Sequence, residues 1–166
     1  MDALFSLPTD EIAVTSDDCY TPRWVFDAMG LRFDLDVAAP VGGAVAVPCD
    51  RYFTATDDGL SQPWDGLVWC NPPYSNYAPW AERFAAHDRA VLMGFLLPQV
   101  RWTKCALQSA DAVAIIGCEF NRPGGKLFRL RQPTFVAFRG VGVKPAEQLA
   151  AADPFGAVLY GRSARR

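Results

Sequence analysis

The segment WCNPPYS, residues 69–75, places two prolines between an asparagine and a tyrosine directly after an apolar run. Each proline fixes one φ angle and lacks an amide donor, so the carbonyl groups around them are held still and stay available as acceptors. The side-chain oxygen of Asn71 and the carbonyl oxygen of Pro72 can together accept two N–H bonds from one amino group. Tyr74 offers an aromatic face to a planar base. The segment therefore predicts a rigid corner that holds an amino group on a flat ring.

The exocyclic amine of adenine has both hydrogens and a flat ring, but its delocalised lone pair makes it a poor nucleophile. Two fixed acceptors favour a pyramidal nitrogen whose lone pair points at an electrophile as charge develops. If the electrophile is a sulfonium methyl group, a single in-line displacement suffices, and positioning supplies most of the acceleration. An adenine in a duplex has to be flipped out of the stack to reach such a corner. The alternative is that Pro-Pro-Tyr forms only a turn with a surface tyrosine.

The composition of the chain excludes several other kinds of site. Its 166 residues, 51% apolar, predict one compact domain, and the net charge of -2 means that any contact with nucleic acid is local. His87 is the single histidine, which excludes Ser-His-Asp triads and histidine metal clusters. The five cysteines contain no Cys-x-x-Cys pair, which argues against a disulfide framework and a zinc site. We therefore expect a protein of the reducing cytoplasm that needs no metal.

Helices and strands alternate along the first two thirds of the chain. Thr21 and Pro22 predict a helix start, with the threonine as cap and the proline at the first helical position, and Gly30 ends that helix. Further helices are predicted over 78–89 and 102–110, and strands over 32–40, 65–71, 90–98, 111–117, 126–130, 133–138 and 155–160. The later strands follow one another directly. The pattern predicts an α/β fold whose sheet is mainly parallel with an antiparallel edge.

Several short motifs, taken in order, resemble the phage-type DNA N-6-adenine methyltransferase family. They are TPRW at 21, LDVAAP at 35, RYFTATDDGL at 51, a tryptophan at 64 and GLVWCNPPYS at 66. The resemblance runs from about residue 20 to 100 and more weakly to about 140. It implies a Rossmann-like, S-adenosyl-L-methionine-dependent methyltransferase domain over residues 21–166. Residues 1–20, acidic and without periodicity, are expected to form a loosely attached arm.

The resemblance also implies roles for individual residues. It makes Asn71, Pro72, Pro73 and Tyr74 the catalytic corner that holds the target amine. The cofactor would be bound by Thr21 and Pro22 near its methionine end, by Asp36 with Ala38 at the first cofactor motif, and by Asp58 near its adenine. Asp36 as a structural loop cap and Asp58 as part of a solvated turn remain alternatives. The sequence departs from related enzymes in having no Gly-rich loop after FDLD, because Gly42 and Gly43 come too late.

One basic stretch, NRPGGKLFRLRQ, is a candidate contact for DNA. It carries Arg122, Lys126, Arg129 and Arg131 with no acid between them. Such charges on a Gly-Gly loop can bind phosphates, which position a duplex without reading its sequence. The alternative is an exposed hairpin with ordinary solvating charge. The five tryptophans are expected to pack in the core or at its rim, with Trp80 the most plausible base-stacking exception.

The sequence as a whole predicts an adenine-specific DNA methyltransferase of phage or prophage type. Its expected partner is double-stranded DNA in the bacterial cytoplasm. No apolar run approaches the roughly 20 residues of a membrane span, so no membrane contact is expected. Two alternatives stay open. The acceptor is an RNA base or a glutamine amide, or the chain is a methyltransferase-like nucleic-acid binding module without turnover.

Overall fold

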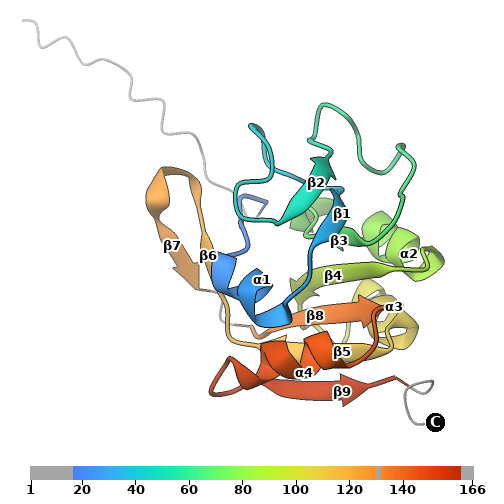
Figure 1. The fold of residues 1–166 in the computed structure, drawn as a ribbon, viewed down its shortest axis with the longest axis vertical. Coiled ribbons are helices and arrows are strands. Elements are labelled where there is room, and N and C mark those ends of the chain that lie inside the picture. The colour runs from blue at the N-terminus through green and yellow to red at the C-terminus, as the bar shows by residue number, and fades with distance from the viewer. Residues whose placement is uncertain (1–16, 130–131, 162–166) are drawn as a thin grey trace, which may run out of the picture.

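The computed structural model describes residues 17–129 and 132–161. Its middle layer is a seven-stranded sheet in the order β2-β1-β3-β4-β8-β5-β9 (Figure 1). The strands are β1 Phe33–Asp36, β2 Cys49–Tyr52, β3 Val68–Cys70, β4 Ala90–Phe95, β5 Ala112–Ile116, β8 Thr134–Arg139 and β9 Ala157–Tyr160. Strands β2, β1, β3 and β4 pair in parallel, whereas β8 pairs antiparallel with β4 and β5, and β9 antiparallel with β5. The predicted α/β fold with a mainly parallel sheet and an antiparallel edge is confirmed.

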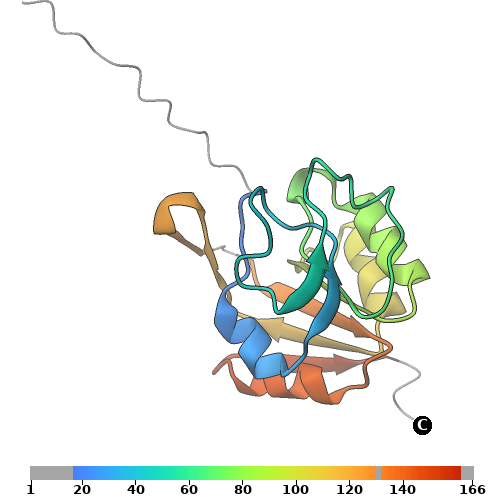
Figure 2. The ribbon, with the colours of Figure 1, turned by 45° about the horizontal axis from the view of Figure 1, so that its top comes forward.

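Helices cover both faces of this sheet (Figure 2). They are α1 Arg23–Met29, α2 Ala78–Ala86, α3 Arg101–Ser109 and α4 Lys144–Ala151. Val91 and Met93 of β4 pack in one apolar cluster with α1 and α4, whereas Ala90 and Leu92 pack in a second cluster with α2 and α3. Alternate side chains of a strand point to opposite faces, so β4 is buried on both sides. Its uninterrupted apolar sequence follows from that position.

The first helix begins differently from its prediction. Pro22 occupies the N-cap, and α1 begins at Arg23 without a side-chain cap. Thr21 does not cap it, because its hydroxyl group bonds to Met93 and to the amide of Asn71. Gly30 ends the helix as predicted, in the left-handed region at φ 62°. The interpretation of Thr21 as a cap is therefore wrong, and the residue belongs to the site described below.

Two elements of the main domain were not predicted. Strand β2 has the sequence CDRY and is largely exposed, so it shows no apolar alternation and forms only by pairing with β1. Helix α4 lies where strands were expected to follow one another. Its inner face is built mostly from small residues, Ala146 and Ala150 beside Leu149, which give a weak apolar signal.

A separate hairpin projects from the body next to the first residues described (Figure 1). Strands β6 Glu119–Asn121 and β7 Leu127–Arg129 pair antiparallel across a turn at Pro123–Gly125. The backbones of Tyr20 and Asn121 exchange two hydrogen bonds of 2.9 Å. The hairpin is thereby fastened to the segment that precedes α1.

Some predicted features lie outside the described residues. They are Arg131 and residues 1–16 of the expected arm. The last four residues of that arm, 17–20, pack instead against the body of the protein. Cys19 is buried, and both carboxylate oxygens of Asp17 accept hydrogen bonds from Ser75. This end of the expected arm is thus part of the folded structure.

Gly59 provides a test of the close packing at the end of β1. A Cβ at this position would clash with the carbonyl oxygen of Val37, although the backbone of Gly59 is not in the left-handed region. We expect Gly59→Ala to lower the free energy of unfolding by about 1–3 kcal/mol, measured by urea denaturation. Gly117→Ala is the control, because its Cβ would meet its nearest neighbour at 3.4 Å. Equal effects of the two substitutions would contradict the steric explanation.

Candidate functional site

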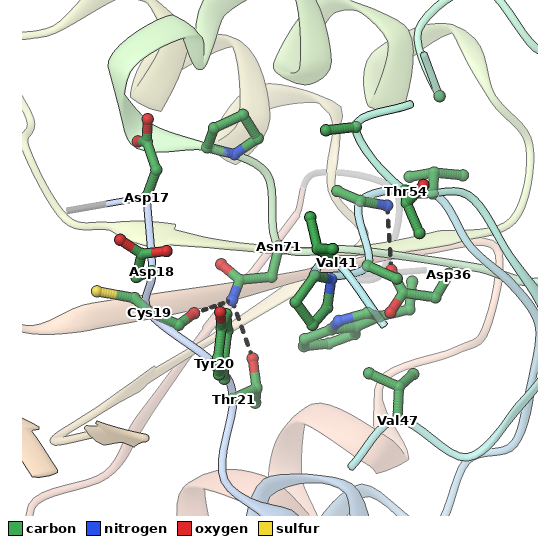
Figure 3. Close-up of a pocket in the computed structure, with 18 of the residues that line it drawn as sticks. Asp17, Asp18, Cys19, Tyr20, Thr21, Asp36, Val41, Val47, Thr54 and Asn71 are labelled. Atoms are coloured by element: carbon green, nitrogen blue, oxygen red, sulfur yellow. Dashed lines mark hydrogen bonds between the residues drawn. The ribbon is translucent and has the colours of Figure 1, made fainter. Parts of the chain in front are cut away.

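A pocket of about 950 Å³ opens at the carboxyl ends of β1 and β3 (Figure 3). Asp36, the last residue of β1, and Asn71, directly after β3, both line it. The chain leaves β1 toward β2 on one side, and β3 pairs with β1 on the other. In open α/β sheets ligands bind in the crevice at such a switch point. The prediction that the LDVAAP and NPPYS motifs lie together at this edge is confirmed.

Segments far apart in the sequence form the walls of the pocket. They are residues 17–21, the loop 36–41 with 45–47, Thr54 and Ala55, residues 58–60, Trp69, Asn71, Pro73, Asn76, Trp80, Asn121 and Pro123. Of the residues predicted for the site, Thr21, Asp36, Ala38, Asp58, Asn71 and Pro73 line the pocket. Pro22, Pro72 and Tyr74 adjoin lining residues in the chain but are not part of the lining, and Arg122 and Lys126 belong to the adjoining hairpin.

The amide of Asn71 is held in one orientation. Its Nδ2 donates to the carbonyl oxygen of Cys19 at 2.8 Å and to Oγ1 of Thr21 at 3.1 Å. Both amide hydrogens are therefore used, and Oδ1 is the atom left to face other partners. Tyr74 donates its hydroxyl hydrogen to this Oδ1 at 3.0 Å, which leaves one lone pair of the oxygen for a ligand. We call Cys19, Thr21 and Tyr74 the Asn71 clamp.

Tyr74 occupies a different place from the one its motif suggested. Its ring stacks on Phe95 with centroids 3.6 Å apart and lies nearly parallel to Tyr77 at 5.7 Å. Burial raises the pKa of the Tyr74 hydroxyl well above its ordinary value, so the group stays a donor. The ring is thus part of an aromatic stack, and Tyr74 is not among the residues that line the pocket. Its contact with the site is the hydrogen bond to Asn71.

Asp36 is a buried acid at the floor of the pocket. Its side chain is 2% exposed, and Oδ1 accepts a hydrogen bond from the amide of Ala38 at 3.1 Å. Burial raises the pKa of this carboxyl to about 7, against the smaller lowering effect of the Ala38 amide. The bond to Ala38 is also the loop cap that the sequence left as an alternative. A cation or hydroxyl group bound here would favour the ionised form.

Asp57 and Asp58 have separate positions in the turn after β2. Asp57 accepts hydrogen bonds from the amide and hydroxyl of Thr54, which lower the pKa of its carboxyl. Asp58 lines the pocket, and its carbonyl oxygen accepts two bonds from Ser61. It has φ 52° and is the one non-glycine residue with positive φ among residues 17–129 and 132–161. The turn interpretation thus describes Asp57, whereas Asp58 belongs to both the turn and the pocket.

Several residues of the pocket were not found from the sequence. Cys19 and Tyr20 fell in the expected arm, and Asn121 opens the basic stretch but was given no role. Val41 and Val45 are 89% and 84% exposed, in a Gly-Gly loop that forms no strand. An apolar run in a loop without strand periodicity was the available signal for this wall. Trp80, the tryptophan singled out as a possible exception to core packing, does line the pocket.

No group of three His, Cys, Asp or Glu side chains in residues 17–129 and 132–161 is arranged to hold a metal ion. Within the same part of the chain, no helix has the length and apolar character needed to cross a membrane.

Comparison with known proteins adds independent information. Residues 10–128 match the family described as DNA N-6-adenine-methyltransferase (Dam). The DNA N-6-adenine-methyltransferase of Haemophilus phage HP1 (strain HP1c1) is 27% identical over 106 residues, which cover 58% of this chain and 60% of the phage protein. The match thus spans less than two thirds of that relative. No solved structure matches the chain.

The raised pKa of Asp36 predicts a pH-dependent stability. Because the folded-state pKa of about 7 exceeds the ordinary 3.8, the folded protein keeps a proton that the unfolded chain releases. The contribution of Asp36 to stability therefore falls as pH rises from about 4 to about 7, by a few kcal/mol. We expect Asp36→Asn to become steadily more stable relative to the wild type across this range, measured by urea denaturation.

Asp27→Asn removes an exposed carboxylate on α1 and controls for the loss of one charge. A stability difference between wild type and Asp36→Asn that does not change with pH would contradict the burial of an acid at this position.

Proposed function

This chain belongs to the DNA N-6-adenine-methyltransferase (Dam) family, and from that premise we propose that it methylates the N6 amine of adenine in double-stranded DNA, with S-adenosyl-L-methionine as donor. The observation that supports this most directly is the fixed amide of Asn71 at the edge of an open pocket. The pocket has a volume of about 950 Å³, which lies within the range of roughly 300–1,000 Å³ typical of small-molecule sites.

We further assign residues 21–166 to one Rossmann-like methyltransferase domain. The three-layer arrangement and the switch point between β1 and β3 support this assignment. Such a domain binds its ligand with the carboxyl ends of adjacent parallel strands. Asp36 of the LDVAAP motif and Asn71 of the NPPYS motif stand at those ends.

Asn71 and Pro72 act on the target amine as acceptors. The remaining lone pair of Asn71 Oδ1 accepts one N–H, and the carbonyl oxygen of Pro72 accepts the other. As the amine nitrogen becomes pyramidal and gains positive charge, these oxygens bind it more strongly than they bind the planar amine. The Asn71 clamp matters because a rotating amide would present Nδ2, a donor, to an amine that also donates. Orientation of this one group is thus the main catalytic contribution of the corner.

The lining of the pocket fits the donor. When bound, S-adenosyl-L-methionine supplies a methyl group on a positively charged sulfur. Asp36 with Ala38 and Asp58 offer oxygen atoms to hydroxyl and amino groups, and the apolar loop around Val41 covers flat or aliphatic parts. Thr21, which precedes Pro22, bonds to Asn71 at the end where the transferred group has to lie. Acidic and apolar walls together suit a cationic molecule with a purine ring.

The hairpin supplies local positive charge beside this pocket. Lys126 is exposed, and the guanidinium of Arg122 lies over the ring of Phe128 at 3.6 Å. Arg129 lies in β7 opposite Glu119. We propose that these residues, together with Arg131, which lies outside the described residues, contact DNA phosphates, which explains how a chain with net charge -2 can bind a polyanion.

The test of the proposed function is transfer of labelled methyl from S-adenosyl-L-methionine to unmethylated duplex DNA, followed by nucleoside analysis. We expect N6-methyladenine from the wild type and at least a hundredfold slower formation by Asn71→Ala, as when a preorganised polar group is removed from other sites. Asn76→Ala, which alters a second asparagine of the same pocket outside the clamp, is expected to keep most of the activity.

RNA and a glutamine-containing protein serve as parallel acceptors. Transfer to one of these alone would reassign the substrate. A folded wild-type protein that transfers methyl groups to none of them would support the binding module instead. Full activity of Asn71→Ala would remove the corner from the mechanism.

Salt dependence tests the hairpin separately from catalysis. If Lys126 neutralises one phosphate, Lys126→Gln lowers the slope of log affinity against log salt concentration by about 0.9. Lys104→Gln, which alters an exposed lysine of α3, should leave the slope unchanged. Fluorescence anisotropy of a labelled duplex over a range of salt concentrations provides the measurement, and equal slopes for the two variants would exclude Lys126 from the interface.

A further inference from the structure

Methylation of a paired adenine requires that the base leave the stack, and the gap that it leaves has to be filled or tolerated. The Tyr74 ring stacks on Phe95 and does not line the pocket, so it is not placed to fill that gap. The β6–β7 hairpin beside the pocket offers a side chain that can. This role of the hairpin rests on the proposed function and on the geometry of its two strands.

The two faces of the hairpin have different environments. Phe120 and Phe128 are directly opposite each other, and both pack against the apolar cluster of the body. Asn121 and Leu127 form the next pair. Directly opposite residues of an antiparallel pair project from the same face, and successive residues project from opposite faces. Leu127 therefore lies on the outer face together with Asn121, which lines the pocket.

Leu127 is 66% exposed on this outer face. A single exposed apolar side chain is common and proves nothing alone. Its surroundings are polar, because Glu119 and Asn121 hold other outer positions of the strand pair, and the exposed Lys126 precedes Leu127 in the chain. An exposed leucine thus shares a strand face with a residue of the pocket wall and has polar neighbours, one of them a cation that can bind phosphate.

The hairpin is held rigidly enough to act as a unit. The Tyr20–Asn121 bridge ties its base to the pocket wall, and the amide of Arg122 donates to the carbonyl oxygen of Lys126 at 2.9 Å. Arg122 also stacks on Phe128. The turn between the strands contains Gly124 and Gly125, with φ 78° and 74°, and projects away from the body (Figure 2). A two-stranded ribbon of this kind fits the major groove of DNA.

We propose that the hairpin enters the groove next to the target and that Leu127 inserts into the base stack at the position vacated by the flipped adenine. Leucine is among the apolar side chains that proteins insert between base steps. Insertion replaces the stacking that the neighbouring bases lose and blocks the return of the adenine. Leu127 is therefore a positioning residue for the extrahelical base and does not contact the transferred methyl group.

The experiment compares two substrates. One is a fully paired duplex, and the other carries an abasic site opposite the target adenine, so that the adenine has no pairing partner. We expect Leu127→Ala to lower kcat/KM at least about tenfold on the paired duplex, because unstacking costs a few kcal/mol per step. On the abasic duplex, where flipping is easy, the variant should stay within about twofold of the wild type.

Two further variants make the result specific. Leu127→Met keeps an apolar side chain of similar length and should restore activity on the paired duplex. Leu159→Ala removes a leucine that is 48% exposed on β9, away from the pocket, and should act like the wild type on both substrates. All these positions are exposed, so folding is expected to be preserved, and unfolding curves verify it.

Fluorescence of 2-aminopurine at the target position reports flipping without methyl transfer. We expect the wild type to raise the fluorescence and Leu127→Ala to raise it much less. This pattern in a protein that transfers no methyl group would contradict the proposed function and still support the insertion. Equal fluorescence and equal kcat/KM for Leu127→Ala and wild type on the paired duplex would overturn the insertion and leave the proposed function intact.

Discussion

The amide of Asn71, bound through both of its hydrogens to Cys19 and Thr21, is the interaction on which the rest of the site depends. These bonds connect the end of β3 to the segment before α1, about 50 residues earlier in the chain. They determine that an acceptor oxygen faces the ligand. A donor in the same place would repel an amine. The bond from Thr21 to Met93 extends this constraint into the apolar core.

Asp36 is the electrostatic counterpart of this corner. Burial alone raises its pKa, and one backbone amide is the partner that the structure assigns to it. An acid held in this way is unfavourable for folding, and it becomes useful when a cationic ligand shares the pocket. The site therefore combines the neutral amide of Asn71, which is held in one orientation, with the carboxyl group of Asp36, whose ionisation depends on the groups around it. Both stand at the carboxyl ends of parallel strands, where ligands bind in open α/β sheets.

The β6–β7 hairpin provides contact surface for a substrate as large as a DNA duplex. A small domain with balanced charge has little surface for a duplex, so the few cations and the exposed leucine of β6–β7 carry much of the contact in our proposal. Tyr20 belongs to the same arrangement, because its backbone joins the hairpin to the segment that orients Asn71. Binding of DNA by the hairpin and orientation of the catalytic amide thus share one short stretch of chain.

The sequence by itself determined the α/β class, the buried strand β4, most helices and the presence of the Asn-Pro-Pro-Tyr corner, because proline restraints and apolar periodicity act over neighbouring residues. Only the tertiary structure decided that Thr21 holds Asn71 instead of capping α1, that Tyr74 stacks on Phe95, and that residues 17–20 close the pocket. It also revealed β2 and α4, whose sequences are too polar or too small to give a clear pattern. The physical reason is that a hydroxyl or an aromatic ring has several partners of similar energy along the chain, and packing between distant segments selects one of them.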